Sequence, residues 1–373
     1  MNALRCTLFA ACLALAAGCG SDDGTAPPRH TLSPGEAFHG TMTPAGPVAA
    51  SDAGQVAITA VADPGFVFAG WVATPADKAV FADAGLAATN VTLSGSATVS
   101  PTFMVAAADF FVNQRLGSDG ATGTTAAQPF RTLTQALVAA GAAGKAAGSV
   151  LAVAPGTYDA ANGEVFPIIV PPYVTLVGDE ENHGAGTVIL GAGPPPGSPT
   201  LATALIPSSY ATLAGLYVQS WGRSTVRYDG PSGGTGITVR RCTIVNTTNT
   251  GSELLVALAS GGAIEDNVFP AGSQVTLGAT GGAGNTRVQG NVFHGPVAVD
   301  DNYLDLGGGA GASTGHNQFL GTRMSWFGGA GTMARNNHWR HVPPTFAPSW
   351  DTSPSDYDIY LAFNATIDVE GSY

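Results

Sequence analysis

The stretch from Ile264 to Phe293 contains one short pattern twice, as Ile-Glu-Asp-Asn-Val-Phe at residues 264–269 and Val-Gln-Gly-Asn-Val-Phe at residues 288–293. An aliphatic residue is followed by two variable residues, an asparagine, one variable residue and an aromatic side chain. Related hexapeptides flank this stretch, with fourth positions at Leu216, Cys242, Asn267, Asn291, Asn317 and Asn337. The successive spacings are 26, 25, 24, 26 and 20 residues. A repeat of this length predicts a stack of similar coils.

The repeated side chains predict what fills such a stack. We expect the aliphatic positions to point inward and to lie over their equivalents in the next coil. Parallel strands lie about 4.8 Å apart, so the asparagines would form a column and hydrogen-bond one another and the turn backbone. A second column would contain the aromatic residues Phe269, Phe293, Phe319 and Trp339.

The composition agrees with short strands and many turns. The 373 residues include 51 glycines, only 11% are charged, and the net charge is −12. Phosphate binding requires clustered lysine and arginine, so the sequence argues against nucleic acid as a partner. We expect a monomer, and an all-β fold with one short helix.

The N-terminal segment is predicted to be a targeting signal and not a folded element. Arg5 precedes an apolar run at residues 6–17, which is too short to cross a bilayer. The sequence Ala-Ala-Gly-Cys at 16–19 resembles a lipobox, which implies a lipoprotein signal peptide at residues 1–18 and a diacylglycerol on Cys19. Such an anchor makes the membrane a partner. The alternative is an ordinary secretory signal in which Cys19 has no role.

Gly20 follows this cysteine. By resemblance to Gram-negative lipoproteins, this residue implies a lipid-anchored protein of the cell envelope, sorted to the outer membrane. Residues 19–29 are rich in glycine, serine, aspartate and proline, which predicts a flexible tether.

Residues 30–104 predict a small antiparallel β module, because short alternating runs are separated by turn residues. The sequence Gly-Phe-Val-Phe-Ala-Gly-Trp at 65–71 and the final strand ending at Phe103 resemble internalin B-repeat-like modules. That resemblance implies a spacer or adhesion module without catalysis. Trp71 could bind sugar from an exposed position, but between strands we expect it in the core.

Residues 105–373 are expected to form the coiled domain. Its first part carries short motifs in a fixed order, namely Val112-Asn113, Gly117-Ser118-Asp119, Pro129-Phe130-x-Thr132, Ala-Pro-Gly-Thr-Tyr at 154–158 and Val-Thr-Leu-Val-Gly at 174–178. They resemble the start of right-handed parallel β-helix proteins of the pectate-lyase-like superfamily, and within it the bacterial lipoprotein-associated domain-of-unknown-function family 1565. Residues 134–147 predict a capping helix across the open end of the solenoid.

Alternation along the repeat predicts an exposed row of polar side chains. The row contains Arg240, Glu265, Arg287, Gln289 and Arg335. These residues can form cross-strand ion pairs, or they can line a shallow groove that binds an extended acidic polysaccharide, because guanidinium groups match carboxylates.

Catalysis is not evident, but two kinds of carbohydrate-active enzyme stay open. A lyase would need an arginine base beside Ca²⁺, because Lys78 lies in the small module and Lys145 in the predicted helix. A glycoside hydrolase needs two carboxyl groups at a defined separation. The candidates for such a site are Asp300, Asp301, Asp305 and His316.

The acidic turn Asp179-Glu180-Glu181 could hold Ca²⁺ or be merely solvated. No other cofactor is expected. The third interpretation of the whole chain is a structural spacer or adhesin.

Overall fold

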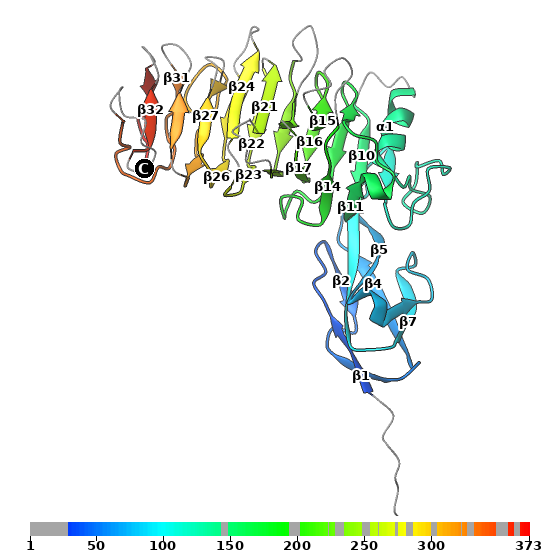
Figure 1. Ribbon diagram of the computed structural model, residues 1–373. Coiled ribbons are helices and arrows are strands. Elements are labelled where there is room, and N and C mark those ends of the chain that lie inside the picture. Colours follow the sequence, from blue (N-terminus) through cyan, green and yellow to red (C-terminus); the bar gives the residue numbers. More distant parts are fainter. Residues whose placement is uncertain are drawn as a thin grey trace, which may run out of the picture.

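The computed structural model describes residues 29–142, 148–193, 202–222, 224–227, 235–247, 254–259, 261–272, 275–280, 286–299, 304–321, 323–326, 332–347, 357–361 and 366–373. The predicted signal peptide, most of the tether, and Cys19, Asp300 and Asp301 lie outside these residues. A small β module joins one end of a long stack of strands (Figure 1).

The small β module consists of two four-stranded sheets. The first has the order β3 (Val48–Ser51), β1 (Arg29–Pro34), β8 (Ala97–Val105), β5 (Phe66–Thr74). The second has the order β2 (Gly40–Thr43), β4 (Gln55–Ala62), β7 (Ala88–Leu93), β6 (Ala79–Phe81), with the short 3-10 helix η1 (Ala76–Lys78) before β6. The pairs are antiparallel except β1 with β8, which is parallel. Trp71 is buried between the sheets and donates its indole N–H to the carbonyl of Leu86, as expected of a core residue.

The larger domain is an all-β parallel β-helix, as the repeat predicts. Its first sheet contains β9 (Phe110–Val112), β10 (Val150–Val153), β13 (Thr175–Val177), β16 (Thr212–Ala214), β19 (Thr238–Arg240), β22 (Ala263–Glu265), β25 (Thr286–Gln289) and β28 (Leu304–Asp305). The second sheet contains β11 (Gly156–Asp159), β14 (Thr187–Leu190), β17 (Tyr217–Ser220), β20 (Thr243–Asn246), β23 (Val268–Phe269), β26 (Val292–Phe293) and β29 (Gln318–Phe319). The 3-10 helix η2 (Ala160–Asn162) follows β11.

Two further sheets complete the wall. One contains β12 (Ile168–Val170), β15 (Thr203–Pro207) and β18 (Ser224–Val226). The other contains β21 (Leu254–Ala259), β24 (Val275–Thr280), β27 (Val297–Val299), β30 (Met324–Trp326) and β32 (Ile359–Leu361). The short strands β31 (Thr332–Met333) and β33 (Ile367–Asp368) pair beside them. Residues 357–361 and 366–373 thus extend the stack with parallel strands at its C-terminal end.

The columns expected from the repeat lie inside this wall. Ile264 aligns with Val239 on one side and Val288 on the other. The asparagine side chains are fully buried, and each amide donates to the next along the column at 2.9–3.0 Å. The aromatic rings of Phe269, Phe293, Phe319 and Trp339 stack at centroid distances of 4.8, 5.2 and 4.4 Å. Both predicted columns are confirmed.

A left-handed residue precedes the fourth position of each hexapeptide repeat, from Leu216 to Asn337, and turns the chain from the first sheet to the second. These residues are Gly215, Arg241, Asp266, Gly290, His316 and Asn336, with φ between 48° and 67°. Non-glycine side chains adopt this conformation only with strain or local support. Because the same turn recurs, the strands of the first sheet end at the same corner in each of these coils.

Helix α1 (Leu133–Ala142) lies at the N-terminal end of the solenoid, as predicted (Figure 1). It begins one residue before the predicted start, and residues 143–147 lie outside the described chain. Its buried face includes Leu133 and Leu137. Glu164 accepts hydrogen bonds from the backbone N–H groups of Leu133 and Thr134 at 2.6 and 2.9 Å, which caps the helix. Asp119 likewise accepts from the N–H groups of Arg131 and Thr132.

Candidate functional site

The predicted polar row lies where strands of the first sheet enter the left-handed turn. Arg240 aligns with Glu265 in the next coil, and Glu265 aligns with Gln289 in the coil after that. Arg287 forms an ion pair with Glu265. We call the surface formed by Glu180, Arg240, Glu265, Arg287 and Gln289 the charged corner.

Arg240 is held at the charged corner by a two-pronged contact. Its Nε and Nη2 donate to the two oxygens of Glu180 at 3.0 and 2.9 Å. Glu180, which the sequence leaves open as a Ca²⁺ ligand or a solvated acid, is the partner of this arginine in the structure. The hydrogen bond to Glu180 raises the pKa of Arg240, against the opposing effect of burial. Even so, 41% of the Arg240 side chain and 37% of the Arg287 side chain are exposed.

Arg335 forms its ion pairs outside the charged corner. Its Nη2 lies 2.6 Å from Asp368 and 3.3 Å from Glu370, both in the last coil. The repeat position between Gln289 and Arg335 is Gly315, which has no side chain. The predicted row therefore consists of one contiguous group and one separate arginine.

The described candidates for catalysis do not form a carboxylate pair. Asp305 is buried and accepts from the backbone N–H groups of Gly307, Gly309 and Ser313 at 2.9–3.0 Å. It therefore shapes its own loop. His316 is exposed at a left-handed turn position. Asp300 and Asp301 lie outside the described residues.

The acidic turn proposed for Ca²⁺ is engaged by other side chains. Asp179 accepts from His39 Nε2 at 3.0 Å, and Glu181 lies 3.5 Å from His39 Nδ1. Within the described part of the chain, no group of three or more histidine, cysteine, aspartate and glutamate side chains is arranged to hold a metal ion.

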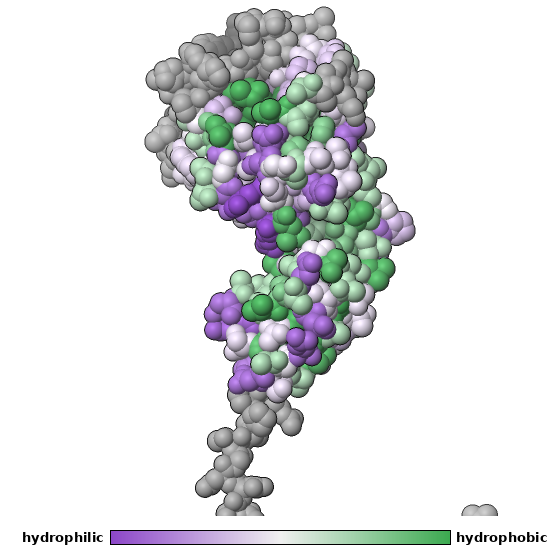
Figure 2. Space-filling view, turned by 90° about the vertical axis from the view of Figure 1, so that its right-hand side faces the viewer, coloured by the Kyte–Doolittle hydropathy of each residue, from purple (hydrophilic) through white to green (hydrophobic). Residues whose placement is uncertain are grey.

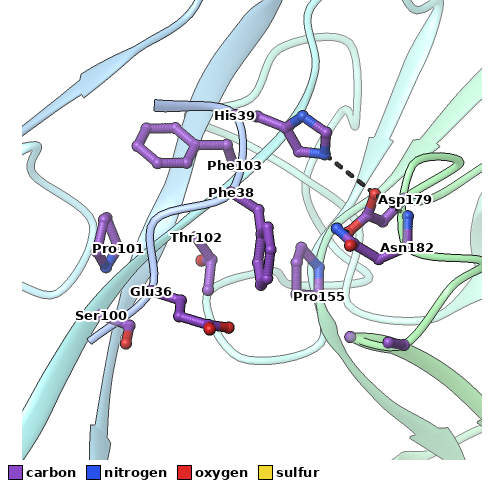
Figure 3. Close-up of a pocket in the computed structure, with 12 residues that line it drawn as sticks. Glu36, Phe38, His39, Ser100, Pro101, Thr102, Phe103, Pro155, Asp179 and Asn182 are labelled. Carbon is purple, nitrogen blue, oxygen red and sulfur yellow. Dashed lines mark hydrogen bonds and ion pairs between the residues drawn. The ribbon is translucent and has the colours of Figure 1, made fainter. Parts of the chain in front are cut away.

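His39 belongs to a feature that the sequence did not reveal. A pocket of about 450 Å³ lies where the small β module meets the β-helix, and we call it the junction pocket. The module contributes Glu36, Phe38, His39, Ser100, Pro101, Thr102 and Phe103, and the β-helix contributes Pro155, Asp179, Asn182, Ala185 and Gly186 (Figure 3).

The small β module and the β-helix, which together form the junction pocket, are also held together by contacts outside it. Asn113 Nδ2 donates to the carbonyl of Ala69 at 2.7 Å, and Met104 packs with Phe111 in a small apolar cluster. The His39 ring is only 7% exposed and stacks on Phe66 with centroids 4.0 Å apart. Figure 2 shows the molecular surface narrowing where the module meets the β-helix.

A protein-family model matches part of the chain. Residues 116–275 match the family described as "Protein of unknown function (DUF1565)". The match covers less than half of the chain and includes coils up to the start of β24. No curated protein and no solved structure matches. The resemblance of residues 30–104 to internalin B-repeat-like modules stays a prediction. None of the described helices is both long and apolar enough to cross a membrane.

Proposed function

We propose that this chain is a lipid-anchored protein of the cell envelope whose β-helix binds an extended acidic polysaccharide along the charged corner. The observation that carries the proposal is the alignment of Arg240 with Glu265, and of Glu265 with Gln289, on successive coils, with Arg287 ion-paired to Glu265. A ligand that runs along the solenoid axis would meet polar groups about 4.8 Å apart, one coil after another.

The arginines suit such a ligand better than a compact one. Glu180 occupies two N–H groups of Arg240, which fixes the plane of the guanidinium while 41% of the side chain stays exposed. A fixed guanidinium can donate two parallel hydrogen bonds to a sugar carboxylate. The neighbouring carboxylates reduce the local positive charge, so affinity should be modest and should fall as salt is added.

Binding to polygalacturonate and to a neutral polysaccharide tests this proposal. We expect Arg240→Gln combined with Arg287→Gln to weaken polygalacturonate binding by about tenfold. Because both arginines are partly exposed, each substitution should cost only about 1 kcal/mol of stability. Arg131→Gln, an exposed arginine outside the charged corner, is the matched control.

Unchanged binding in the double variant, or an equal loss in Arg131→Gln, would contradict the proposal.

The same mixtures of protein and polysaccharide, assayed for reaction products, show whether the chain is an enzyme. Release of reducing sugar, or absorbance from unsaturated uronate, would identify a hydrolase or a lyase in place of a binding protein. No binding and no product would leave the spacer or adhesin interpretation.

A further inference from the structure

The junction pocket contains hydrogen-bond acceptors to which few protein groups donate. Among the described residues, none donates a hydrogen bond to the Glu36 carboxylate. The Thr102 hydroxyl donates to the carbonyl of Gly70 at 2.9 Å, and the Asn182 side-chain amide donates to the Asp179 carboxylate at 2.8 Å. Each donation leaves an oxygen of that side chain able to accept a further hydrogen bond, and the Glu36 carboxylate can only accept. The pocket therefore favours a ligand that supplies donors.

The same pocket has a flat apolar wall. Phe38 is 52% exposed although it is a large aromatic residue, and its ring stands across the pocket between Thr102 and Pro155 (Figure 3). An exposed aromatic face beside proline suits the apolar face of a ring-shaped ligand. It also attracts cations, because the face of an aromatic ring carries partial negative charge.

Negative charge predominates around the pocket. Glu36 and Asp179 line it, Glu181 lies beside His39, and the lining contains no lysine or arginine among the described residues. His39 is the one basic group of the lining, and it is already placed between two carboxylates. A cationic ligand gains from this balance, and an acidic one is repelled.

We infer that the junction pocket is a binding site for a compact cationic amine carried on a ring-sized body, with the ammonium against Glu36 and the body against Phe38. A volume of about 450 Å³ accommodates one such ring with its substituents. This ligand differs in charge from the acidic polymer proposed for the charged corner, although the acidic turn at residues 179–181 contributes to both surfaces.

Glucosamine is the probe that tests the site, with glucose and N-acetylglucosamine as controls that keep the ring and lack the charged nitrogen. Calorimetry and saturation-transfer NMR on the full chain should show glucosamine binding more tightly than either control. Glu36→Gln should weaken glucosamine binding by about fivefold and bring it close to that of glucose. Phe38→Ala should weaken binding of every ring.

Asp63→Asn is the matched control, because Asp63 is an exposed carboxylate of the same module that does not line the pocket. Thermal melting of each variant separates a binding loss from unfolding. Glucose binding as tightly as glucosamine, no effect of Glu36→Gln, or no glucosamine binding at millimolar concentration would each overturn the inference. Loss of glucosamine binding in Arg287→Gln, which neither lines the pocket nor pairs with the acidic turn at residues 179–181, would also overturn it.

Discussion

The side-chain amide of Asn291 donates to the side-chain oxygen of Asn317, one coil further along, over 2.9 Å. The same Asn291 accepts two hydrogen bonds from Asn267 through its own oxygen and donates to the carbonyl of Ile264. Replacing Asn291 with leucine would leave several of these buried groups without a partner. We expect Asn291→Leu to lower the free energy of unfolding by about 3 kcal/mol, measured by chemical denaturation.

The neighbouring residue Gln318 provides the control for this column. Gln318 follows Asn317 directly, and its side chain is exposed on β29. Gln318→Leu should change the unfolding free energy by less than about 0.5 kcal/mol. If the two leucine variants were equally stable, the buried amides would not be what holds successive coils in register.

The sequence was sufficient to predict the fold because the interior columns repeat at nearly constant spacing. Asn267 and Phe269 occupy equivalent places in successive coils only if the strands are parallel and in register, so one pattern determines topology and core together. The exposed row could be predicted in part by alternation along the same strands, which correctly placed Arg240 beside Glu265.

The junction pocket could not be predicted in this way. Its walls come from residues as distant as His39 and Asp179, and they meet only because the module docks on the first coils. No repeat or motif specifies that docking. The pairing of Glu180 with Arg240 was missed for a similar reason, since their separation of 60 residues spans more than one coil.

Alanine substitutions at two glycines of the coil turns can separate the cost of backbone strain from the cost of a steric clash. Gly215 and Gly261 both have positive φ, 61° and 73°. A Cβ at Gly215 would lie 2.4 Å from the backbone nitrogen of Glu180, whereas one at Gly261 would meet nothing within 4 Å. Gly261→Ala should therefore cost about 1 kcal/mol from strain alone, and Gly215→Ala distinctly more. Equal melting temperatures for the two variants would contradict this difference.

Asp358 predicts a pH dependence at the C-terminal end of the solenoid. Burial alone would raise the pKa of this carboxyl, but hydrogen bonds from Thr345 and His341 outweigh it and lower the pKa. The carboxylate is therefore favoured in the folded state. Its contribution to stability is complete above the unfolded pKa of about 3.9 and is lost as pH falls through the lower folded value.

Unfolding measured across this acidic range should thus show a steeper loss of stability for the natural chain than for Asp358→Asn. The asparagine variant should be less stable near neutral pH, because it loses the charged partner of His341 and Thr345. Parallel pH profiles for the two proteins would show that Asp358 does not contribute in this way.

Cys19 provides the test of the proposed anchor. If the lipobox resemblance is correct, cells fed a clickable palmitate analogue should label this protein, and Cys19→Ser should abolish the label. The same variant should leave the membrane fraction, because the lipid chains supply the affinity for the bilayer. Cys242 cannot account for labelling, since burial raises the pKa of its thiol to about 12 and keeps it protonated. Persistent labelling of Cys19→Ser, or an unlabelled natural protein, would refute lipid anchoring at this residue.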